Sequence, residues 1–168
     1  MTHIWQVSDK KEEQFLRTKV SHFAFTKNEE KELRALQQTM RVVMKEAQGI
    51  GLSANQIGIA KRIFVAQVPD KNGRMKWYTV LNPEIIKQSK QMVDMEEGCL
   101  SVPEVFGSVT RPFAITIEGH NLQGKKIKIE AQGLLARVFQ HEIDHLNGGL
   151  FIDKCKDLKP HPRVHAKQ

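Results

Sequence analysis

The residues with the clearest chemical potential form the run His141-Glu142-Ile143-Asp144-His145. Side chains four residues apart on a helix lie on one face, so the two imidazoles can bind one metal ion while Glu142 lies beside it. A glutamate in that place can take a proton from a water that the metal activates. As ordinary polar positions of an amphipathic helix, the two histidines would be buried beside Phe139 and Leu146 without partners, which is costly. We therefore interpret this run as part of a metal site with its own base.

A hydrolytic metal site needs a third protein ligand and leaves one position open for water. Cys99 is a candidate, because Gly98 relieves steric crowding next to it and a bound metal would hold its thiol as a thiolate. A single cysteine is more often an inert core residue, so residue type alone does not select Cys99. The other candidates for the third ligand are His120, Asp153, Cys155, Asp157, His161 and His165. Of these, His161 and His165 flank Pro162 in a segment that offers little rigid support for a metal site.

Three motifs together resemble the signatures of the peptide deformylase family. A glycine-rich loop that ends in glutamine, 49–56, precedes Glu97-Gly98-Cys99-Leu100-Ser101, and the histidine run follows in the expected order. The resemblance continues to Asp153, whereas the first forty residues and the end of the chain match only loosely. The loop has Ser53 and Asn55 where the family more often has alanine and proline, a difference that we expect to change loop stiffness.

The resemblance implies a metallo-hydrolase that removes the N-formyl group from the N-terminal methionine of nascent polypeptides and releases formate. It assigns Cys99, His141 and His145 as the ligands of one divalent metal ion. Fe(II) is the metal that the family typically uses, and Ni(II), Co(II) or Zn(II) can substitute for it. The resemblance also makes Glu142 the general base of the reaction.

The family pattern further implies how charge on the formyl oxygen is stabilised and how the peptide is bound. The side-chain amide of Gln56 and the backbone N–H of Leu100 are expected to donate hydrogen bonds to the developing oxyanion. Ile50 and Gly51 are expected to present backbone groups to an extended peptide, with Gly51 allowing close approach. On residue type alone, Gln56 is equally consistent with a loop glutamine that binds its own backbone.

Four further residues are candidates for supporting roles. Asp144, beside His145, is expected to orient the site, with Arg111 as its counter-ion. Val138 is either a wall of the methionine pocket or a core residue, and Arg137 lies either on an exposed helix face or at the rim of the peptide groove.

Two helices and a β-rich middle must position these motifs. Residues 26–48 have an amphipathic helical period, a capping-box spacing between Thr26 and Glu29, and a stop at Gly49. The second helix is predicted to begin near Gly133 and to end at 147–149. Between them, short β-type runs predict an antiparallel, α+β single domain, and these runs are 62–68, 77–81, 113–118 and 126–130, with a hairpin turn at 120–124.

The chain length of 168 residues fits one domain, which we place at 1–152, followed by a basic tail at 153–168 that we expect to be at least partly disordered. No run approaches the roughly 20 apolar residues of a membrane span, and no signal-peptide pattern is present. Two cysteines are too few for a disulfide framework and favour a reducing compartment. We therefore expect a cytoplasmic protein without a membrane partner, and a mature organellar enzyme remains the alternative.

The net charge of +7 is spread along the chain, so it does not predict a specific nucleic-acid site, although it is compatible with contact to the ribosome. The expected partners are N-formylmethionyl nascent peptides and the ribosome. Three other readings are a general HExxH metallopeptidase or other metal-dependent amidohydrolase, an RNA- or ribosome-binding module with a structural metal, and a copper electron carrier. The second predicts a closed site with four ligands, whereas the motifs supply three ligands and a glutamate. The third has no use for Glu142.

Overall fold

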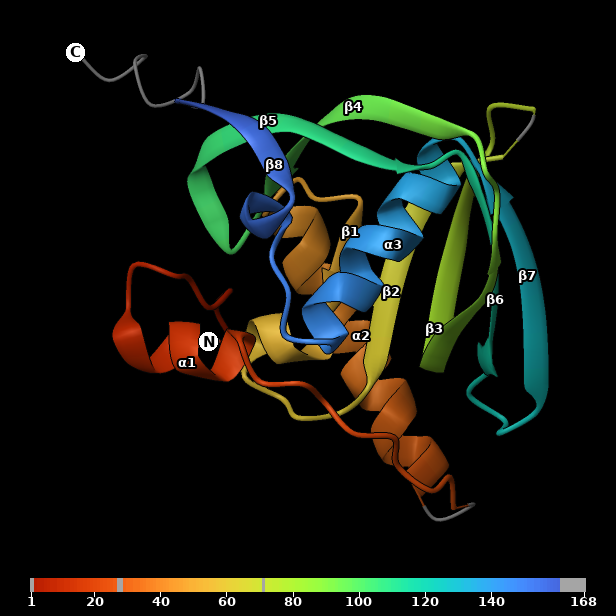
Figure 1. Cartoon of the computed structure of the whole chain (residues 1–168). Coiled ribbons are helices and arrows are strands. Elements are labelled where there is room, and N and C mark those ends of the chain that lie inside the picture. The colour runs from red at the N-terminus through yellow and green to blue at the C-terminus, as the bar shows by residue number, and fades with distance from the viewer. Residues whose placement is uncertain (1, 27–28, 71, 161–168) are drawn as a thin grey trace.

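A computed structural model describes residues 2–26, 29–70 and 72–160. It confirms the expected α+β class, with helices and antiparallel sheets in one chain (Figure 1). The larger sheet has the order β1-β2-β3-β6-β7, and the smaller sheet has the order β4-β5-β8. The helices are α1 (Lys10–Leu16), α2 (Glu30–Glu46) and α3 (Leu134–Leu146), and the strands are β1 (Gly51–Ser53), β2 (Ile63–Pro69), β3 (Met75–Gln88), β4 (Met92–Cys99), β5 (Val102–Pro112), β6 (Ala114–His120), β7 (Lys126–Gln132) and β8 (Cys155–Pro160).

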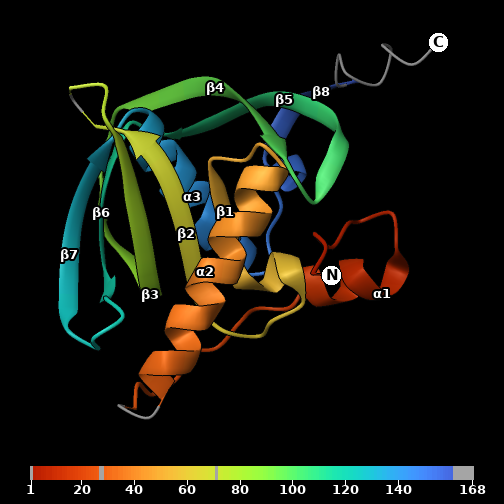
Figure 2. The ribbon, with the colours of Figure 1, turned by 180° about the vertical axis from the view of Figure 1, so that it is seen from behind.

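Helices α2 and α3 cover opposite faces of the larger sheet (Figures 1 and 2). Strand β2 shows why, because its side chains alternate between two apolar clusters. Phe64 and Ala66 pack with the apolar face of α3, whereas Ile63 and Val65 pack with that of α2. A strand that is buried on both faces has a nearly continuous run of apolar residues, and the sequence of β2 has such a run.

The two predicted helices are present, with small changes at their ends. The first begins at Glu30 rather than near Thr26, and Glu29 occupies the N-cap position. The predicted pair still interacts, since the Thr26 hydroxyl donates to Glu29 Oε2 over 2.8 Å. The second helix begins one residue after Gly133 and has Asn147 as its C-cap, as expected. The β6–β7 hairpin is also confirmed.

Several elements lacked a clear sequence signal. Helix α1 spans only seven residues, of which Leu16 alone is buried. Strand β4 has only one buried residue, and its sequence has no regular apolar alternation. Part of the segment that we expected to be a tail forms β8, which pairs with β5 from Cys155 to Pro160. Residues 161–168, with His161 and His165, lie outside the described residues, and the domain boundary at 152 stays a prediction.

Gly148 ends α3 in a conformation that other residues adopt with strain. Its φ is +78°, its N–H donates to the carbonyl of His145 over 3.0 Å, and an added Cβ would lie 2.3 Å from the carbonyl oxygen of Arg17. We expect Gly148→Ala to lower the free energy of unfolding by about 1–3 kcal/mol, measured by chemical denaturation.

Gly73 provides the matched control, because its φ is +75° and no atom of the described residues lies within 4 Å of an added Cβ. Gly73→Ala should therefore introduce backbone strain alone, and it should lower the free energy of unfolding by less than Gly148→Ala does. Equal losses in the two variants would contradict the contact between the end of α3 and Arg17.

Among the residues that the structure describes, no helix is both long enough and apolar enough to cross a membrane.

Candidate metal centre

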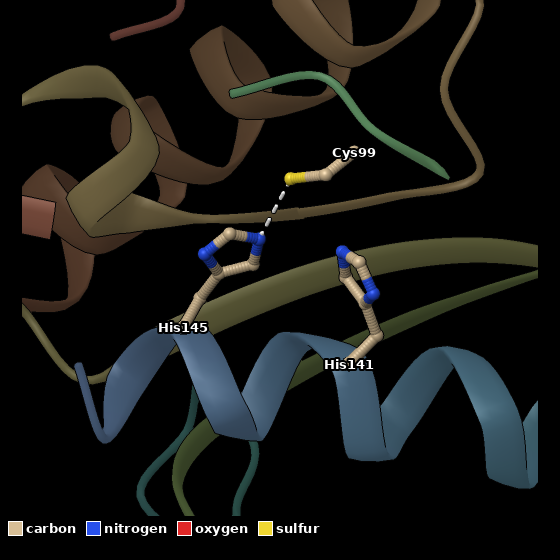
Figure 3. Close-up of side chains that lie close together, drawn as sticks. All are labelled: Cys99, His141 and His145. Atoms are coloured by element: carbon tan, nitrogen blue, oxygen red, sulfur yellow. Dashed lines mark hydrogen bonds between the residues drawn. The ribbon is translucent and has the colours of Figure 1, made fainter. Parts of the chain in front are cut away.

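Cys99, at the end of β4, lies next to His141 and His145 on α3 (Figure 3). One ligand atom from each residue lies within 4.8 Å of the other two, and Cys99 Sγ is 3.1 Å from His145 Nε2. One thiol and two imidazoles form a donor set suited to a divalent transition metal. This grouping brings together the three residues that the family pattern assigns as ligands.

The charges around the thiol favour its role as a ligand. Burial would raise the pKa of Cys99, but the imidazoles of His145 and His141 outweigh burial and bring this pKa well below its usual value. Burial would likewise lower the pKa of His141, whereas hydrogen bonds to Cys99 and Glu97 raise it well above the usual value. The thiolate that a metal requires is therefore the favoured form of this cysteine.

Glu142 lies beside this group and is only 3% exposed. Burial raises the pKa of its carboxyl group to about 7, and the neighbouring imidazoles oppose that shift. Its Oε2 is buried and has no hydrogen-bond partner among the described residues. A Cβ at Gly51 would lie 2.3 Å from its Oε1, so a larger residue at this position would displace the carboxylate from its present place. A buried carboxyl group with a pKa near neutrality, beside three side chains that could bind a metal ion, fits a hydrolytic metal site.

The carboxylate that contacts a ligand imidazole is Glu97, which the sequence reading did not single out. Its Oε2 accepts a hydrogen bond from His141 Nδ1 over 3.0 Å, and its two oxygens accept from Arg111 Nε over 2.6 Å and Nη2 over 2.8 Å. Burial would raise the pKa of Glu97, but these partners hold it well below its usual range. Glu97 lies on β4, which the sequence did not predict, so its contact with α3 had no sequence signal.

The expected pair of Arg111 and Asp144 is in contact, with 2.6 Å between Arg111 Nη1 and Asp144 Oδ2. Asp144 also binds Lys154, so it links α3 to the segment before β8. Its role in orienting the site stays a prediction. Arg137 is not on an exposed face: it is 6% exposed and donates to Glu97 Oε1 and to the carbonyl of Val109.

Gln56 is held in one orientation by its neighbours. Its Oε1 accepts hydrogen bonds from the backbone N–H and hydroxyl of Ser53, over 2.9 and 3.0 Å. Its Nε2 therefore points the other way, donating to Ser101 Oγ over 3.1 Å and lying 3.8 Å from Cys99 Sγ. The oxygen of the Gln56 side chain thus binds its own loop, as expected of a loop glutamine. The nitrogen, Nε2, faces the candidate metal centre. Sequence reasoning did not find the part played by Ser101.

A cavity of about 570 Å³ opens beside Cys99 and His141, between β1 and β4. The carbonyl of Ile50 accepts a hydrogen bond from the Gln67 N–H of β2. Since successive residues of an antiparallel strand point their backbone groups to opposite sides, those of Gly51 point away from β2. Val138 belongs both to the core and to the cavity wall. The predicted residues on this wall are Ile50, Gly51, Gln56, Leu100, Arg137, Val138 and Glu142.

Comparison with known proteins agrees with this geometry. The family model described as polypeptide deformylase matches residues 1–161. A peptide deformylase from Rhizobium meliloti is 44% identical over 128 residues, which cover 76% of this chain and 74% of the relative. The peptide deformylase of Halothermothrix orenii is 50% identical over 111 residues, which cover 66% of this chain and 70% of the relative.

Solved structures show the same likeness. A probable peptide deformylase from Synechococcus phage S-SSM7 has a TM-score of 0.81 at 38% identity and covers 92% of this chain and 99% of its own. The peptide deformylase of Thermotoga maritima has a TM-score of 0.82 at 34% identity, and the match covers 94% of this chain and 99% of that one. With the family model matching nearly the whole chain and the three signature motifs converging on one site, this chain belongs to the polypeptide deformylase family.

Proposed function

We propose that this site removes the N-formyl group from the N-terminal methionine of nascent polypeptides. The observation that carries the proposal is the convergence of Cys99, His141 and His145 beside the buried carboxyl group of Glu142. Cys99, His141 and Glu142 line one cavity. A divalent ion held by these three ligands would polarise the formyl carbonyl and lower the pKa of water. The protein residues would supply the remaining chemistry.

Glu142 would accept the proton of the attacking water and pass it to the nitrogen that leaves. The carbon–nitrogen bond of the formamide breaks, giving formate and a free amine. As charge grows on the formyl oxygen, Gln56 Nε2 and the N–H of Leu100 would donate hydrogen bonds to it. The bonds from Ser53 support this role, because they prevent the amide of Gln56 from turning its oxygen toward the site.

The peptide would bind in extended form between the two sheets. Strand β1 ends one sheet and β4 ends the other, and both line the cavity. An extended chain can add to such edges through backbone hydrogen bonds, for which Gly51 offers groups that β2 does not use. The apolar side chains of Ile50, Leu134 and Val138 would surround the methionine side chain.

The identity of the metal and the cellular context belong to the same proposal. We infer Fe(II) as the native ion, with Ni(II), Co(II) or Zn(II) able to replace it, since nitrogen and sulfur ligands bind all four. The enzyme would act in the cytoplasm on formylated chains as they leave the ribosome, without a membrane or a specific nucleic-acid partner. The basic surplus of +7 supports contact with an RNA-rich particle.

The test is formate release from a formyl-methionyl peptide by anaerobically prepared protein loaded with Fe(II) or Ni(II). We expect release from this peptide, none from its acetylated counterpart, and no cleavage of an unformylated peptide. Cleavage of the unformylated peptide would instead indicate a general HExxH metallopeptidase. One bound metal per chain without formate release from the formylated peptide would show a metal site with another substrate.

A further inference from the structure

The two histidines of the metal centre are held in different ways. His141 Nδ1 interacts with Glu97, which fixes its ring. The corresponding atom of His145, Nδ1, is buried and has no hydrogen-bond partner among the described residues. The ring of His145 therefore lacks the outer hydrogen bond that usually orients a metal-binding imidazole. Its position depends on where the backbone of His145 lies.

That backbone is tied to the glycine-rich loop by a residue 90 positions away. Asn55 is fully buried, and its Nδ2 donates to the carbonyl oxygen of His145 over 2.7 Å. The same carbonyl also accepts from the N–H of Gly148, which belongs to the turn that follows and moves with the helix. Asn55 is thus the donor that fixes this carbonyl relative to the other side of the site.

The rest of the Asn55 side chain gives no other reason for an amide at this position. Its Oδ1 is buried and has no partner among the described residues, which costs free energy. An apolar side chain of similar size would avoid that cost. The amide is therefore explained by its single bond from Nδ2 to His145.

We propose that Asn55 is a positioning residue that sets the place of the His145 imidazole by holding the His145 carbonyl. This inference rests on the proposed role of His145 as a metal ligand. Without the bond, the His145 carbonyl and the ring that follows its backbone can shift locally relative to β4, which changes the separation of His145 Nε2 and Cys99 Sγ. The metal centre would then bind its ion less tightly.

The end of α3 stays docked when this bond is removed. The next carbonyl, that of Leu146, accepts hydrogen bonds from the N–H of Val20 over 2.9 Å and from Arg62 Nη1 over 3.1 Å. Variants of Asn55 should therefore fold, with a local change at His145.

The experiment uses the full chain loaded with Co(II), whose visible absorption reports ligand geometry. The first variant is Asn55→Leu, because leucine has a size similar to that of asparagine. The second is Asn55→Ala, which introduces no new contact and so covers the case in which leucine does not fit. We expect both to release Co(II) to excess chelator about 10- to 100-fold faster than the wild type and to show an altered spectrum. Release at the wild-type rate with an unchanged spectrum would overturn the proposal.

Gln37→Leu is the matched control. Gln37 is a buried amide that donates to Thr79 Oγ1 over 2.7 Å in the contact between α2 and β3. Its loss should lower stability without changing Co(II) release. Equal acceleration by Gln37→Leu would mean that general loosening, not the bond to His145, governs release.

A His145→Ala variant separates failure of this proposal from failure of the proposed function. If His145→Ala holds Co(II) as firmly as the wild type, His145 is not a ligand and the proposed metal centre is wrong. If His145→Ala loses Co(II) while both Asn55 variants retain it, the metal centre stands and the role of Asn55 is refuted.

Discussion

Glu142→Gln should lower the rate of formate release by about 10²- to 10⁴-fold while leaving the metal content unchanged. The amide keeps the size of the side chain but cannot accept the proton of the attacking water. Glu142 is next to His141 in the chain but outside the set of three ligand atoms, so its replacement should leave that set intact. The measurement is formate release at saturating substrate, with metal per chain determined in parallel.

Stability gives an independent check on the same variant. Because burial raises the pKa of Glu142 to about 7, the ionised carboxylate is less favourable in the folded chain than in the unfolded chain. A neutral amide should therefore not lower the free energy of unfolding near pH 7. Glu118→Gln, an exposed change of the same kind on β6, should leave both rate and stability unchanged. A Glu142→Gln enzyme with more than a tenth of wild-type activity would exclude Glu142 as the base.

Glu97→Gln should lower the free energy of unfolding by about 3–5 kcal/mol, because it leaves the guanidinium groups of Arg111 and Arg137 buried without their common counter-charge. The two arginines are only 3% and 6% exposed, so water cannot replace the carboxylate. The same change should weaken metal binding about 10- to 100-fold, since His141 Nδ1 loses a charged acceptor. Denaturant unfolding at pH 7 and competition with a chelator measure the two effects.

The pH dependence follows from the sign of the Glu97 shift. The folded chain holds the pKa of this carboxyl well below its ordinary value of 4.5, so its stabilising contribution is present above pH 4.5 and is lost as the pH falls below that value. The Glu97→Gln variant cannot lose the contribution of this carboxylate, so its stability should fall less than that of the wild type as the pH is lowered. Glu96→Gln, at the exposed neighbouring position of β4, is the control and should match the wild type. Similar unfolding curves for both variants would argue against the buried network.

The sequence predicted the elements whose side chains repeat with a clear period. Helix α3 has apolar residues along one face and a glycine-rich end, and its predicted and observed ends agree within about one residue. The β6–β7 hairpin was predicted for the same reason, since its strands alternate and its turn residues are typical. Strand β4 and strand β8 were not predicted, because neither carries a regular apolar pattern: half of the residues of β4 and most of those of β8 are exposed.

For the site, the sequence by itself determined the pair His141 and His145, because four residues of helix place two side chains on one face whatever the rest of the fold. The resemblance to a family supplied Cys99 and Gln56, which spacing alone left open. Only the tertiary structure showed that Glu97 contacts His141 and that Asn55 holds His145. Those contacts join segments 44 and 90 residues apart, so they depend on how β4 and the glycine-rich loop dock against α3, and no local sequence pattern encodes that docking.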